Sequence, residues 1–194
     1  MKKLFFPLLF GLISTFIYAA PFGLKMSMTI EEIAEQCEEE PAFIKDDIYL
    51  VKPIKKHPFF YYYTVYINEK TGLYQIRAIS DSVTCNKYGT EIQNAFNTVK
   101  DRIAKTYGRP IIIDKLDSSS IWKGDNYWFR SLEDGARQLS AIWGEKTELA
   151  DGLSTVALDC VADNDAFHYE DAHLVLYYYF ENANSVEDEQ DSVF

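Results

Sequence analysis

The densest group of side chains that could carry chemistry lies between residues 163 and 173, where six of the eleven residues are Asp, Glu or His. Imidazole and carboxylate together suit a divalent metal ion. We single out His168, Glu170 and His173 as candidate metal ligands, which would support a metal-dependent hydrolase. Their spacing matches neither a metalloprotease helix nor a calcium loop, and a polar loop between two strands accounts for the same residues. We therefore expect no cofactor and keep the metal site as the alternative.

Other catalytic patterns are missing from the sequence. The serine run at residues 118–120 has no Gly-x-Ser-x-Gly context, and the remaining histidine, His57, precedes Pro58 in a segment that reads as a loop. The nine glycines are scattered and form no phosphate-binding loop. These observations favour a protein that is not an enzyme.

Two runs of three tyrosines, at residues 61–63 and 177–179, fall in segments with strand character. Alternation along a strand places Tyr61 and Tyr63 on one face, and likewise Tyr177 and Tyr179. Tyrosine is enriched at interfaces because it joins a large apolar body to a polar tip. We predict that these four tyrosines form a binding face for a protein, with ordinary sheet packing as the alternative.

The three cysteines are Cys37, Cys85 and Cys160, so one of them has no partner within a monomer. A bridge between Cys85 and Cys160 would close a long loop, for which chain entropy predicts a stabilisation on the order of 4 kcal/mol. The other two pairings stay open. Three buried free thiols are an equally good reading at this chain length.

The charge balance restricts the class of partner. Asp and Glu outnumber Lys and Arg by 30 to 19, for a formal charge of −11 among 194 residues. Binding to nucleic acid without sequence preference needs a basic surface, so we expect no nucleic-acid partner. An acidic protein associates faster with a basic one, so we expect a protein partner that is basic.

Residues 1–19 have the three parts of a secretory signal peptide: Lys2 and Lys3, an apolar run, and a small residue, Ala19. A membrane anchor is the alternative, because residues 4–20 have about the minimum length for crossing a bilayer. We expect cleavage after Ala19, no stable membrane span after cleavage, and a periplasmic or secreted protein.

Two capping boxes predict where helices begin. Thr29 with Glu32 opens a short helix with an apolar stripe that ends at Cys37, and Thr90 with Gln93 opens a longer one. The stripe of the longer helix consists of residues 92, 96, 99, 103 and 107. Gly108 follows as the expected helix end.

The order of elements predicts an α+β fold with two helix-plus-antiparallel-sheet halves packed together. Strands are expected at residues 47–54, 59–67, 73–79, 137–143, 154–162 and 173–182, with an apolar segment at 111–113 and a helical turn at 127–132. The halves span about 22–86 and 87–183, within one domain over 20–183. Residues 184–194 read as an acidic flexible tail.

The segment at residues 22–33, a Met-Ser-Met-Thr-capped helix start followed by a hairpin, resembles two groups of small bacterial envelope proteins. These are the BamE/SmpA-type outer-membrane assembly lipoproteins and the β-lactamase inhibitor proteins. With residues 57–59, 72–74 and 88–91, the whole pattern is similar to a group of uncharacterised secreted bacterial proteins. The resemblance implies a non-catalytic module of the envelope that binds another protein, such as an inhibitor or immunity-like protein.

Overall fold

The computed structural model describes residues 20–163 and 170–186. Its helices are η1 (Pro21–Gly23), α1 (Ile30–Ala34), α2 (Thr90–Tyr107), η2 (Asp125–Tyr127) and α3 (Trp128–Glu133). Its strands are β1 (Ala42–Lys45), β2 (Ile48–Val51), β3 (Phe60–Asn68), β4 (Gly72–Ser80), β5 (Val83–Thr84), β6 (Ile111–Leu116), β7 (Arg137–Trp143), β8 (Leu153–Ala162) and β9 (Asp171–Phe180). The α+β fold class is confirmed.

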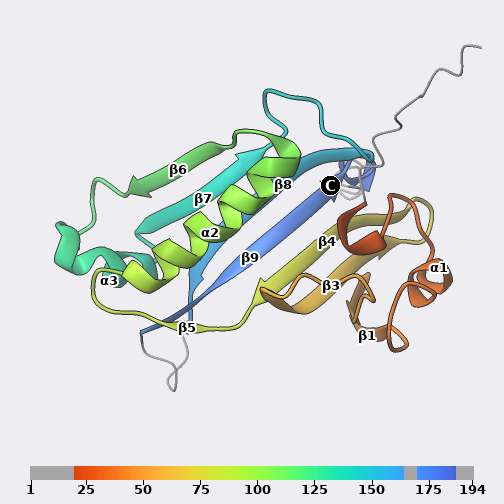
Figure 1. Ribbon diagram of the computed structural model, residues 1–194, viewed down its shortest axis with the longest axis horizontal. Coiled ribbons are helices and arrows are strands. Elements are labelled where there is room, and N and C mark those ends of the chain that lie inside the picture. Colours follow the sequence, from red (N-terminus) through yellow and green to blue (C-terminus); the bar gives the residue numbers. More distant parts are fainter. Residues whose placement is uncertain (1–19, 164–169, 187–194) are drawn as a thin grey trace, which may run out of the picture.

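All nine strands belong to one antiparallel sheet rather than to two packed sheets. The strand order is β1-β2-β3-β4-β9-β8-β7-β6, and the short β5 pairs with β9 beside β4. The two expected halves are therefore joined edge to edge, because β9, the last strand of the described residues, lies between β4 and β8 (Figure 1).

One face of this sheet is covered by the helices. Helix α2 crosses β8 and β9, and its buried stripe is the predicted one, with Tyr107 half-buried (Figure 1). The N-terminal segment packs on the same face, since the Phe22 ring meets those of Tyr63 and Tyr178 edge-on. Tyr107 also packs against Tyr178. The core lies between the helices and this face of the sheet.

The two predicted helix starts differ in how they are capped. Thr29 and Glu32 form the expected capping box at α1. At α2 the N-cap is Gly89, in a left-handed conformation, and no side chain caps it. Asn86 accepts hydrogen bonds from the backbone of Tyr88 and Thr90, so a residue upstream of the predicted box satisfies these amides.

The beginning of the expected tail is part of the folded protein. Val186 is buried, so the tail does not begin at residue 184, and residues 187–194 lie outside the described part. No helix in residues 20–163 and 170–186 has the length and apolar character needed to cross a membrane.

Candidate functional site

A β-bulge in β3 decides which tyrosines of the first run reach solvent. Phe60 pairs with Ser80 and Tyr62 with Ile79, so Tyr61 is an extra residue without a partner on β4. Tyr61 and Tyr62 are 66% and 53% exposed, whereas Tyr63 is 2% exposed. The prediction that Tyr61 and Tyr63 share a binding face is wrong, because the bulge interrupts the simple alternation.

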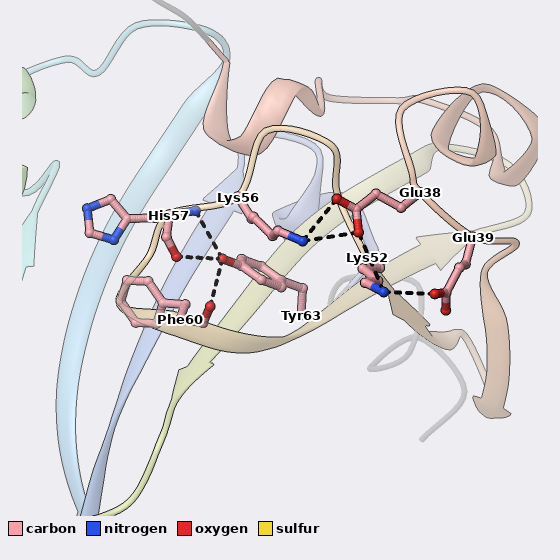
Figure 2. A network of polar contacts seen from close by, with 7 residues as sticks. All are labelled: Glu38, Glu39, Lys52, Lys56, His57, Phe60 and Tyr63. Atoms are coloured by element: carbon pink, nitrogen blue, oxygen red, sulfur yellow. Dashed lines mark hydrogen bonds and ion pairs between the residues drawn. The ribbon is translucent and has the colours of Figure 1, made fainter.

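Tyr63 instead anchors the loop that precedes β3. Its hydroxyl accepts a hydrogen bond from the backbone N–H of His57 at 3.1 Å. The same hydroxyl can donate a hydrogen bond to the carbonyl oxygen of His57, at 3.1 Å, or to that of Phe60, at 3.2 Å (Figure 2). Burial raises the pKa of Tyr63, so the hydroxyl keeps this proton. The loop is thereby tied to the core.

Next to this loop lies a groove of about 690 Å³, which we call the tyrosine groove. Its lining combines aromatic, aliphatic and charged side chains: Glu39, Glu40, Ala42, Leu50, Val51, Lys52, Lys56, His57, Pro58, Phe60, Tyr61, Tyr62 and Tyr63. The rings of Tyr61 and Tyr62 meet edge-on with centroids 5.0 Å apart. The two exposed rings therefore present both apolar surface and hydroxyl groups to a binding partner.

An exposed ion-pair network lies along one wall of the tyrosine groove. Lys52 Nζ lies 2.8 Å from Glu39 Oε1, and Lys56 Nζ lies 2.9 Å from Glu38 Oε1 (Figure 2). The hydrogen bond from Lys56 lowers the pKa of Glu38, and the bond to Glu39 raises the pKa of Lys52, so Glu38 and Lys52 are charged at neutral pH. Glu40 has no ion-pair partner within the described residues.

Exposed apolar side chains are frequent in the segment that forms this groove, and three of them, Leu50, Tyr61 and Tyr62, line it. Among the described residues, six of the eleven large hydrophobic side chains that are exposed lie between residues 43 and 62. They are Phe43, Ile44, Leu50, Ile54, Tyr61 and Tyr62. Scattered exposed apolar residues are normal, but Leu50, Tyr61 and Tyr62 share the groove with Glu39, Glu40 and two lysines, and apolar residues rimmed by polar ones mark an interaction surface. Strand β1 also leaves one edge of the sheet unpaired in the described structure.

The second tyrosine run alternates as predicted. Tyr178 is buried beneath the helices, and Tyr177 and Tyr179 lie half-buried on the opposite face, stacked with centroids 6.0 Å apart. Arg77 lies over the Tyr177 ring. Through the pairing of β3, β4 and β9, these rings share that face with Tyr62 and not with Tyr63. Two of the four predicted binding tyrosines, Tyr177 and Tyr179, thus lie on the same face of the sheet as Tyr62 but do not line the groove.

Two of the three candidate metal ligands, Glu170 and His173, lie within the described residues. His168 lies outside the described residues, and Glu170 is exposed, with a positive φ. His173 Nδ1 lies 2.5 Å from Asp163 Oδ1, whose other oxygen accepts a bond from Ser82. Asp163 therefore separates serine from histidine, whereas nucleophile activation needs the base directly on the hydroxyl. Within residues 20–163 and 170–186, no three His, Cys, Asp or Glu side chains are grouped to hold a metal.

The cysteines are free thiols in the structure. Cys85 follows β5 beside one edge of β9, and Cys160 lies on β8 beside the other edge. The bridge between them that the sequence left open as one possibility is not formed. The Cys85 thiol donates to the carbonyl of Val83 at 3.2 Å. Burial raises the pKa of Cys85 to about 11 and raises that of Cys160 further. Neither thiol is suited to act as a nucleophile.

Sequence reasoning missed the acidic and aliphatic part of the groove. Glu39 and Glu40 read only as the end of a helix, and Leu50 only as part of a strand. These residues come together with the exposed apolar side chains only through the pairing of β1, β2 and β3, so the sequence alone does not indicate the group. Comparisons with protein-family models, curated proteins and solved structures find no match to this chain.

Proposed function

We propose that this chain is an exported, non-enzymatic protein-binding module of the bacterial envelope that binds a basic partner through the tyrosine groove. The observation that carries the proposal is the pair of exposed rings, Tyr61 and Tyr62, beside the unpaired carboxylate of Glu40. A lysine or arginine from a partner can pack its chain on these rings and place its charge near Glu40.

The overall charge supports the same class of partner. A chain with a formal charge of −11 attracts a basic protein over a distance of about 10 Å at 0.1 M salt, and this attraction weakens as salt rises. Binding carried by the rings is less sensitive to salt, because burial of aromatic surface contributes most of its energy. Inhibitor or immunity-like activity toward a secreted basic enzyme fits this combination.

The test compares three baits: the unchanged protein, the double variant Tyr61→Ala with Tyr62→Ala, and the control Tyr88→Ala. Tyr88 is also exposed but precedes α2, outside the groove. Each bait captures proteins from periplasmic extract at low and high salt, and mass spectrometry identifies them. We expect a basic protein that is captured by the unchanged and control baits at low salt and is lost with the double variant. Capture by all three baits alike would overturn the proposal, and so would no capture by any.

A further inference from the structure

A second hollow, which we call the basic cleft, lies on the helical face on the other side of the His57 loop. It has a volume of about 440 Å³, within the range of roughly 300–1,000 Å³ that small-molecule sites occupy. Its walls are the N-terminal segment, the loop before β3 and the C-terminal half of α2, and β9 forms its floor. The lining residues come from four places in the sequence that only the fold brings together.

The deep part of the basic cleft is apolar. Phe60, Val99, Leu176 and Tyr178 are buried residues of the core that also line this hollow. Phe22 closes one side, with its ring 4.8 Å from that of Tyr63. Because the packed core fixes these side chains, the floor does not have to rearrange to accept an apolar chain.

The rim of the basic cleft is cationic, although the protein as a whole is acidic. Lys55, Lys56 and Arg102 line the cleft, and none of its described lining residues is Asp or Glu. Lys56 is paired with Glu38, whereas Lys55 and Arg102 have no acidic partner in the described part of the chain. Two unpaired cations above an apolar floor are complementary to a ligand with an anionic head and an apolar body.

The hydrogen-bonding groups of the cleft are consistent with the same ligand. His57 Nδ1 accepts the backbone N–H of Phe59 at 3.2 Å, which leaves Nε2 as the nitrogen that carries the proton. Its ring points away from Lys56 and Tyr63 (Figure 2). Arg102 and His57 line the same cleft, and burial, followed by the charge of Arg102, lowers the pKa of His57. His57 is thus a neutral donor in the wall of a cleft that Lys55 and Arg102 also line.

We propose that the basic cleft binds a small amphipathic anion, with a carboxylate or phosphate head at Lys55 and Arg102 and an alkyl chain on the floor formed by Phe60, Val99 and Leu176. This site shares the wall formed by residues 56–58 and Phe60 with the tyrosine groove, but its cations Lys55 and Arg102 and its floor do not line that groove. It gives the chain a second ligand class, an acyl or alkyl anion of the kind that lipids supply.

The test is a calorimetric titration of the purified protein with ligands of one chain length and different heads. Decanoate and decyl phosphate represent the two head groups, and decanol and decyltrimethylammonium are the neutral and cationic controls. We expect the two anions to bind at least tenfold more tightly than either control, and inorganic phosphate alone not to bind measurably. Decanoate should also bind at least tenfold more tightly than hexanoate, since each buried methylene contributes about 0.8 kcal/mol, or nearly fourfold.

Charge variants locate the site. Lys55→Gln and Arg102→Gln should each weaken decanoate binding by about two- to fivefold, the range expected for an exposed charge pair. The control is Lys105→Gln, which removes the same charge from the same helix but does not line the cleft. Equal binding of decanoate and decanol, equal loss in all three variants, or no binding at all would each overturn the proposal. No protein partner is involved, so a failure here leaves the proposed function untouched.

Discussion

Removal of the Tyr63 hydroxyl should destabilise the protein without opening a cavity. In Tyr63→Phe the ring stays in the core, but the hydroxyl no longer accepts from His57 N or donates to the carbonyl of His57 or Phe60. The hydroxyl has one proton, so two hydrogen bonds are lost at a time. At about 1 kcal/mol net for each, the free energy of unfolding should fall by about 2 kcal/mol.

Urea denaturation followed by circular dichroism measures this loss. Tyr62→Phe is the matched control on the same strand, because the Tyr62 hydroxyl is exposed and makes no hydrogen bond within the described structure. The control should change the free energy of unfolding by less than about 0.5 kcal/mol. If Tyr63→Phe is equally mild, the loop is not anchored as we describe, and the wall shared by the groove and the cleft has another origin.

Three other predictions test separate parts of the structure. Gly72→Ala should cost clearly more stability than Gly135→Ala in thermal unfolding: both positions have a positive φ, but only at Gly72 would the new Cβ lie 2.3 Å from a backbone oxygen. In an NMR titration, His57 should have a pKa below 6.5, and Arg102→Gln should raise that pKa without restoring it, because burial is the larger cause. As pH falls, His57 is protonated in the unfolded chain before it is protonated in the folded protein. The free energy of unfolding should therefore be highest above pH 6.5, where His57 is neutral in both states, and should decrease as pH falls below 6.5. The Cys85 thiol is buried and has a pKa of about 11 in the folded protein, so iodoacetamide at pH 8 should leave it unmodified. After unfolding, the same reagent should modify Cys85.

The regular elements could be predicted because their signals are local. The apolar stripe and terminal Gly108 define α2, and the alternation of β7 identifies its seven residues. The two-residue strand β5 and the fully exposed β1 carry no such pattern, since their positions depend on pairing with β9 and β2. Edge and very short strands are defined by their neighbours more than by their own residues.

The sites depended on features that spacing does not record. One extra residue in β3 places Tyr63 in the core instead of on the expected binding face. That bulge is defined by the pairing of β3 with β4, which the sequence of β3 alone does not give. Lys55 and Arg102 are far apart in the sequence and line one cleft only because α2 folds back over β9. Alternation did predict that Tyr177 and Tyr179 share a face, and both are half-buried there, whereas of the first pair only Tyr61 is exposed.

The central claim is that a basic protein binds at the tyrosine groove. The most direct test measures amide hydrogen exchange of this chain with and without the captured partner. The amides of residues 39–62 should become protected when the partner is added at low salt, and the protection should weaken at high salt. Protection confined to α2 or to the β6 edge, with residues 39–62 unchanged, would contradict the account.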